Sequence, residues 1–201
     1  MPCYEFQGIR PVVNPGSFVH PQASLIGDVI VSAGCYIGPG ASLRADFGRI
    51  IVESDCSVQD CATIHVSNQR DTVIRRGTTI AHGAVIHGCE IGENCLVGIN
   101  SVVLDAAVLG RECLVGALSL VRHGMEVPER SLLTGTPARI VRALSVEEVT
   151  WRNDGDGDYQ HLTRETLSSL RETEPLAEPE PDRKRITLTA SPVRPGGGSS
   201  A

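Results

Sequence analysis

The stretch IGENCLVGINSVVLDAAVLGRECLV, residues 91–115, decides the fold. Its aliphatic residues recur every six positions, and glycine follows three of the first four. A period of six fits neither an α-helix, which repeats every 3.6 residues, nor a simple alternating strand. It fits a short strand followed by a corner, with three such hexads closing one coil of a triangular prism.

The same register extends over most of the chain. In each hexad the aliphatic side chain would point inward and stack on its equivalent one coil later, while glycine gives the corners conformational freedom. The sequence therefore predicts an all-β solenoid, a parallel β-helix, although periodicity alone leaves its handedness open. The inward positions are Leu25, Val31, Ile37, Leu43, Val52, Val58, Ile64, Ile91, Val97, Val103, Leu109, Val115, Val121, Val127 and Leu133.

Two breaks interrupt this register. Leu43 and Val52 are nine positions apart, so three extra residues enter near 46–49. Ile64 and Ile80 are sixteen apart, which indicates a loop leaving the prism around 67–71. Insertions in solenoids leave the stacked core and commonly build the functional site.

Composition narrows the class of function. Aromatic residues are 3% of the chain, which suits a thin core of small branched side chains. The net charge is -6 and no basic run exceeds residues 183–185, so we expect no nucleic-acid partner. The absence of a signal peptide and of a membrane-spanning stretch predicts a cytoplasmic protein without a membrane partner. The seven cysteines contain no Cys-x-x-Cys pair and are predicted to be small buried residues in a reducing compartment.

The hexads stop after Pro137, so we expect a β-helix over residues 1–143 and a helix packed on the prism within 144–173. Ser145 and Glu148 have the spacing of a capping box at the start of that helix. Its apolar stripe would come from Trp151, Leu162, Leu167 and Leu170, with a possible interruption at the run from Asp154 to Asp158. Residues 174–201 are rich in proline and glutamate and are predicted to be an extended, largely disordered tail.

Three of the six histidines lie close together in the sequence. His65 and His87 each follow an inward aliphatic residue and are 22 positions apart, one coil plus the four-residue loop. We therefore expect them side by side on one face. His82, five positions before His87, should lie around a corner and reach the same metal ion only from a symmetric neighbour.

The motifs around these histidines resemble the γ-class carbonic anhydrases. The resemblance rests on Leu43-Arg-Ala-Asp46, Val58-Gln-Asp60, His65 and His82-Gly-Ala-Val-Ile-His87. It implies a trimeric, left-handed parallel β-helix with zinc, or another divalent ion such as iron or cobalt, at each subunit interface. The ligands would be His65, His82 and His87. Gln59 would hydrogen-bond the metal-bound water or hydroxide, and Arg44, Asp46 and Asp60 would orient the site.

Within that superfamily the chain is most similar to the PaaY and CaiE type of hexapeptide-repeat protein. The supporting stretches are residues 27–30, 45–49, 151–160, 174–176 and 183–185, so the likeness covers nearly the whole chain. This resemblance implies a thioesterase acting on acyl-CoA by-products of phenylacetate catabolism. A metal-bound hydroxide would attack the thioester carbonyl, which the same ion can polarise.

Three departures from the pattern keep other functions open. Ala45 and Cys61 replace a glycine and an asparagine, and residues 67–72 lack the glutamates that shuttle protons in rapid carbon dioxide hydration. Carbonic anhydrase is the first alternative. The others are a hexapeptide acyltransferase, which uses a catalytic histidine without metal, and a metal-stabilised trimer without catalytic activity.

Overall fold

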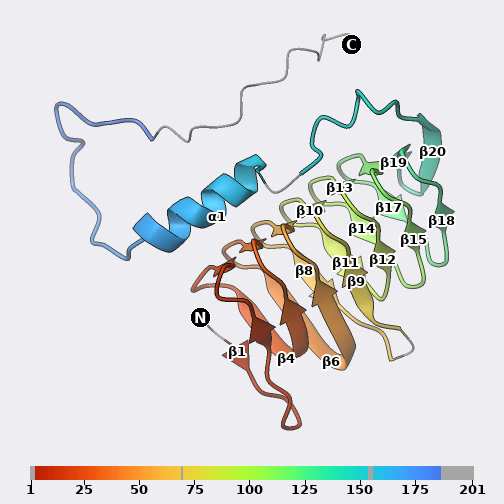
Figure 1. The fold of residues 1–201 in the computed structure, drawn as a ribbon, viewed down its shortest axis with the longest axis horizontal. Coiled ribbons are helices and arrows are strands. Elements are labelled where there is room, and N and C mark those ends of the chain that lie inside the picture. The colour runs from red at the N-terminus through yellow and green to blue at the C-terminus, as the bar shows by residue number, and fades with distance from the viewer. Residues whose placement is uncertain (1–2, 69, 154–155, 187–201) are drawn as a thin grey trace.

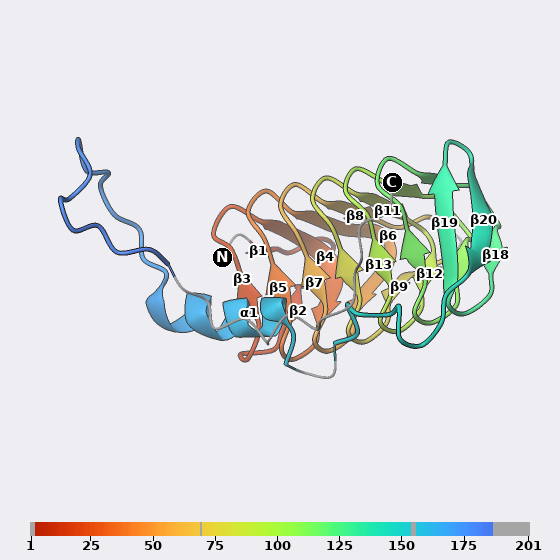
Figure 2. The ribbon, with the colours of Figure 1, turned by 90° about the horizontal axis from the view of Figure 1, so that it is seen from above.

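The computed structural model describes residues 3–68, 70–153 and 156–186, which form a β-helix with one C-terminal helix (Figure 1). The coils stack in chain order from one end of the prism to the other (Figure 2). Neighbouring strands on all three faces are parallel, apart from the last pair. The predicted fold class, a left-handed parallel β-helix with a C-terminal α-helix, is confirmed.

The strands fall into three faces. The first holds β1 (Cys3–Tyr4), β8 (Thr63–His65), β11 (Val85–His87), β14 (Val102–Val103), β17 (Leu120–Val121) and the first halves of β4 (Ser24–Val31) and β6 (Ser42–Val52). The second holds β2 (Val12–Val13), β9 (Thr72–Ile74), β12 (Glu90–Ile91), β15 (Val108–Leu109), β18 (Glu126–Val127) and the second halves of β4 and β6. The third holds β3 (Phe18–Val19), β5 (Tyr36–Ile37), β7 (Ser57–Val58), β10 (Thr79–Ile80), β13 (Leu96–Val97), β16 (Leu114–Val115), β19 (Ser131–Gly135) and the antiparallel β20 (Ala138–Ala143).

The core is the inward stack that the sequence predicts. Every predicted inward residue is at most 5% exposed. On the first face Leu43 pairs with Ile64, and Ile64 pairs with Ile86, so like side chains lie directly above one another. Each such residue removes its full apolar surface from water, which stabilises the fold by about 1.5–3 kcal/mol per side chain.

Both predicted insertions are confirmed by the strand register. Paired residues on the third face lie 18 positions apart in the regular coils, but Tyr36 pairs with Ser57 and Ser57 pairs with Thr79. The coil between Tyr36 and Ser57 contains the extra residues 46–49, at an irregularity in β6. The coil between Ser57 and Thr79 contains the loop 67–71, which has an antiparallel bridge between Ser67 and Arg70. Both insertions leave at the corner between the first and second faces, so the core stack is undisturbed.

A column of hydroxyl and thiol groups lines the corner between the second and third faces. Cys35, Cys56, Cys95 and Cys113 each donate a hydrogen bond of 3.1 Å from Sγ to a backbone carbonyl oxygen. Thr78 fills the same position with a 2.7 Å bond from its hydroxyl. These cysteines are buried as predicted, but they act as donors to corner carbonyls rather than as apolar filler. Cys89 is also buried, whereas Cys3 and Cys61 are exposed, which corrects the prediction for those two.

The C-terminal helix α1 (Asp158–Ser169) lies against β3 and β5 (Figures 1 and 2). It is held by polar contacts, because Gln160 Nε2 and Asn153 Nδ2 both donate to the carbonyl oxygen of Asp55, at 2.6 and 2.8 Å. Tyr159 packs on Tyr36 with ring centroids 5.3 Å apart.

The predicted start and apolar stripe of this helix are wrong. Glu148 does accept a hydrogen bond from the Ser145 amide, but it also pairs with Arg142 and holds a turn, and the helix begins at Asp158. The buried helical residues are Gln160 and Thr163, while Leu162 is half-buried and Leu167 and Leu170 are exposed. Trp151 precedes the helix, where it is half-buried and donates from Nε1 to the Asn94 carbonyl at 2.8 Å. Among the described residues, no backbone amide donates to the Asp55 carbonyl, so the polar side chains of Gln160 and Asn153 are buried against it. Residues 154, 155 and 187–201, part of the predicted acidic run and tail, lie outside the described residues; 174–186 contain no helix or strand.

None of the helices in the described part of the chain is long and apolar enough to cross a membrane.

We expect Leu109→Ala to destabilise the protein by about 2–5 kcal/mol, because it leaves a cavity in the inward stack. Val108→Ala, on the same strand but 36% exposed, should cost less than about 1 kcal/mol. Urea unfolding of both variants at one protein concentration measures the difference. Equal losses of stability would contradict the inward assignment.

Gln160→Ala should loosen α1 without weakening the prism, because it removes one of the donors to the Asp55 carbonyl, a contact worth roughly 1 kcal/mol. Backbone hydrogen exchange should become faster in residues 158–169 and stay unchanged in the strands. Glu165→Ala, an exposed change on the same helix, serves as the control. Unchanged exchange in Gln160→Ala would show that this contact does not hold the helix.

Candidate metal centre

His65 and His87 lie side by side at the corner between the first and second faces. They end strands β8 and β11, which pair residue for residue, so the two histidines are direct neighbours. Each follows an inward isoleucine, and strand alternation turns both rings outward. His65 Nδ1 and His87 Nε2 are 3.0 Å apart, and the ring centroids are 5.0 Å apart. The predicted side-by-side placement is confirmed.

Asp46 and Arg44 lie against His65, on the coil before it. Asp46 Oδ1 is 2.8 Å from His65 Nε2, and Asp46 Oδ2 is 2.6 Å from the Arg44 guanidinium. Partial burial acts to raise the pKa of Asp46, but the hydrogen bonds from Arg44 and His65 outweigh it and hold that pKa below its ordinary value. Asp46 is therefore an ionised acceptor at neutral pH.

Asp105, which the sequence reasoning missed, contacts His87 from the coil after it. Its Oδ1 is 2.8 Å from His87 Nδ1. Partial burial acts to raise the pKa of Asp105, but the hydrogen bond and the electrostatic interaction with His87 outweigh it and lower that pKa. Asp105 could have been found from its spacing, since it lies 18 positions after His87 and second after the inward Val103, as Asp60 is second after Val58.

His82 lies on the turn after β10, at the corner between the third and first faces. Its Nδ1 is 2.9 Å from Oδ2 of Asp60, which occupies the equivalent turn one coil earlier. The His82 side chain is 44% exposed. It lies five positions before His87, and the chain between them turns a corner at Gly83. As predicted, it lies around a corner from the other two histidines.

Gln59 is 5% exposed and precedes Asp60 on the turn that faces His82. Its side-chain amide makes no hydrogen bond to the residues that the structure describes. One chain thus brings the predicted site residues together as two groups. Arg44, Asp46, His65 and His87 share one edge of the first face, while Gln59, Asp60 and His82 share the opposite edge. Within the described residues of one chain, no cluster of three or more histidine, cysteine or acidic side chains suits a metal ion.

The hydrogen-bond pattern at His65 and His87 fits a bound cation. A carboxylate only accepts, so His65 Nε2 and His87 Nδ1 must carry hydrogens toward Asp46 and Asp105. In the neutral rings the remaining nitrogens then face each other with lone pairs, 3.0 Å apart. Such a pair needs a shared proton or a metal ion between its members. Nitrogens on one tetrahedral zinc ion lie about 3.3 Å apart, because each Zn–N bond is about 2.0–2.1 Å long. The distance between the two ring nitrogens would therefore need to increase by only about 0.3 Å for both to bind one zinc ion.

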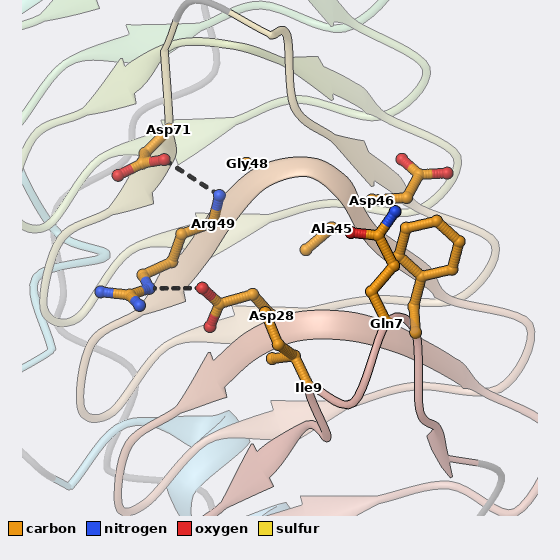
Figure 3. A pocket seen from close by; sticks show the side chains of 9 residues that line it. Gln7, Ile9, Asp28, Ala45, Asp46, Gly48, Arg49 and Asp71 are labelled. Atoms are coloured by element: carbon orange, nitrogen blue, oxygen red, sulfur yellow. Dashed lines mark hydrogen bonds and ion pairs between the residues drawn. The ribbon is translucent and has the colours of Figure 1, made fainter.

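A pocket of about 410 Å³ adjoins this group on the side of Asp46 (Figure 3). The irregular segment 45–49 forms one wall, and the N-terminal turn around Gln7 forms another. Arg49 links two walls of the pocket. Its side chain pairs with Asp28 of β4 at 2.9 Å, and its backbone amide donates to Asp71, just before β9, at 2.9 Å. Residues of both insertions thus line a pocket that includes Asp46, the partner of His65. The lining residues are Phe6, Gln7, Ile9, Asp28, Ala45, Asp46, Gly48, Arg49 and Asp71.

The comparisons with known proteins agree with this architecture. Residues 88–123 match the family model for the bacterial transferase hexapeptide (six repeats). The carnitine operon protein CaiE of Escherichia coli K12 is 47% identical over 196 residues, covering 96% of this chain and all of that protein. CaiE of Proteus sp. strain LE138 is 44% identical and covers 98% of this chain and all of its own.

The chain belongs to the CaiE family of hexapeptide-repeat proteins.

Solved structures extend the likeness to the fold. A hexapeptide transferase family protein from Anaplasma phagocytophilum superposes with a TM-score of 0.77 at 32% identity, over 81% of this chain and 96% of that one. A putative acetyltransferase from Bacillus cereus gives a TM-score of 0.73 at 27% identity, over 82% and 92% of the two chains. The CaiE family assignment thus rests on relatives that match 96% or more of the chain, and the solved structures match 81% and 82% of it.

Proposed function

We propose that this CaiE-family chain is a metal-dependent hydrolase of acyl-CoA thioesters that works as a homotrimer. A divalent ion, zinc or else iron or cobalt, would lie at each subunit interface between His65 and His87 of one chain and His82 of the next. The observation that carries the proposal is the pair of ring nitrogens at 3.0 Å, each ring held from behind by a carboxylate.

The trimer explains why the third histidine lies on the opposite edge of the first face. His82 has its Nδ1 on Asp60, which leaves Nε2 directed away from its own carboxylate. A three-fold arrangement that packs the His82 edge of one chain against the His65 edge of another completes three equivalent sites.

Apolar side chains on the first face support the same packing. Ile99 is 48% exposed and Leu118 is 69% exposed, both on the corner that carries His82. Val85, Val102 and Leu120 point outward from the strands between the two corners and are only partly covered. Exposed apolar side chains gathered beside a polar site are typical of a protein interface.

The residues of this chain divide the work of the proposed reaction. His65, His82 and His87 would supply neutral nitrogen ligands and leave a fourth position open. Asp46 and Asp60 fix the tautomers of His65 and His82, while Arg44 keeps Asp46 ionised. An ion held there acidifies water and polarises a carbonyl oxygen. Gln59 would hydrogen-bond the metal-bound water or hydroxide, and the pocket beside Asp46 would hold the acyl group.

Thioester hydrolysis is favoured over carbon dioxide hydration by the loop after β8. Rapid hydration needs a side chain that carries protons away, and residues 67–71 contain no glutamate. Asp71 is the acidic residue of this loop, and it is engaged with the Arg49 amide. Acyl transfer is the second candidate, because solved neighbours are named as a hexapeptide transferase and an acetyltransferase. The acyl groups to test are those of phenylacetate catabolism and, given the name of the CaiE relatives, those of carnitine metabolism.

The direct test combines metal content, oligomer mass and turnover. Wild-type protein purified without chelator should be a trimer with about one divalent ion per chain and should hydrolyse one of the acyl-CoA thioesters. His82→Ala should lose the ion and the activity, whereas His123→Ala, an exposed histidine outside the site, should keep both. Chelation should abolish hydrolysis and added zinc should restore it.

Each alternative gives a different result in this experiment. Acyl transfer to an added amine or alcohol that survives complete chelation would replace the hydrolase with an acyltransferase. Carbon dioxide hydration well above the buffer rate, without thioester cleavage, would identify a carbonic anhydrase. A wild-type trimer that binds the ion but turns over no substrate would be a metal-stabilised assembly, and one that refuses added zinc would overturn the metal centre.

A further inference from the structure

Asp105 is the acidic neighbour of His87 that the family motifs did not supply. We propose that Asp105 is a positioning residue that fixes which nitrogen of His87 faces the metal ion. The inference rests on the proposed metal centre and adds a residue to it.

The contact is direct and leaves one tautomer. Asp105 Oδ1 lies 2.8 Å from His87 Nδ1, and the two side chains are 31% and 33% exposed. At this distance the carboxylate oxygen accepts the Nδ1 hydrogen, and the lone pair of Nε2 is directed toward His65 Nδ1, 3.0 Å away. The reverse tautomer would direct a hydrogen at the position of the ion and exclude it.

The fold clears a path for this contact at Gly88. A Cβ on Gly88 would lie 2.4 Å from Asp105 Oδ1, and the residue has a φ of +53°. A side chain at position 88 would therefore displace the carboxylate from the ring. Gly88, at the corner after His87, therefore leaves the space that the Asp105 carboxylate occupies.

Comparison with the other corners separates corner packing from metal positioning. The same arrangement, an Asp or Asn oxygen lying over a glycine of the coil before it, occurs at Gly77 with Asn94 and at Gly83 with Asn100. Asparagine satisfies those corners, so the geometry alone does not demand a carboxylate. Asparagine in that pose would turn a neutral oxygen to Nδ1, a weaker acceptor than a carboxylate, and a flipped amide would present its NH₂ group and favour the other tautomer. The negative charge at position 105 is therefore not needed by the corner, and we assign it to the ring nitrogen of His87.

The test uses the nearly isosteric Asp105→Asn in the full-length trimer, with zinc as the probe. Zinc affinity, measured by competition with a chromophoric chelator at fixed pH, should fall by about 10- to 100-fold. The melting temperature of the metal-free protein should stay close to that of wild type, because the corner still fits asparagine. Asp55→Asn, which changes a carboxylate that lies over Gly34 in the same corner arrangement but pairs with Arg76 and no histidine, should keep wild-type zinc affinity.

Asp105→Ala should lose zinc affinity at least as strongly, whatever it does to stability. If Asp105→Asn binds zinc as tightly as wild type, or if its affinity falls only in step with the melting temperature, Asp105 is a structural corner residue and the inference is wrong. Wild-type protein that binds no zinc would instead overturn the metal centre itself, so the two failures are distinguishable.

Discussion

Each coil of the prism must bring its inward aliphatic side chain back to the position directly above the one before it. Three hexads do this in 18 residues, and the stack then excludes water along the whole axis. Any extra residue would break the stack if it stayed within a face, so additions are confined to corners. This single packing constraint fixes the strand pairing, the place of the insertions and the outward direction of the residue after each inward one.

The candidate metal centre is a consequence of that register. Because Ile64 and Ile86 stack, the residues that follow them stand side by side on the outer surface, and both are histidine. The coils on either side contribute a carboxylate each, Asp46 from the first insertion and Asp105 from a regular corner. The two insertions leave at the same corner and enclose a pocket there.

The sequence was sufficient wherever periodicity controls the structure. Six-residue spacing predicted the inward stack, and the breaks at 46–49 and 67–71 predicted both insertions. The sequence was insufficient where the structure depends on a hydrogen bond between polar groups on different coils. The buried face of α1 carries Gln160 because its side chain donates a hydrogen bond to the backbone carbonyl of Asp55. A pattern of apolar residues cannot predict the position of such a carbonyl. Asp105 escaped notice for a related reason, since its partner lies one coil away and the family motifs end before it.

The claim on which this account rests is that one ion is shared between two chains. Two variants of the chain test it, His82→Ala and His65→Ala, co-expressed with different tags so that mixed trimers can be isolated. Neither pure trimer has a complete site, but every mixed trimer has one interface where intact His65 and His87 meet the neighbour's intact His82. The account predicts about one divalent ion per mixed trimer and essentially none in either pure trimer. Mixed trimers without metal, or a His82→Ala trimer with its full complement, would contradict it.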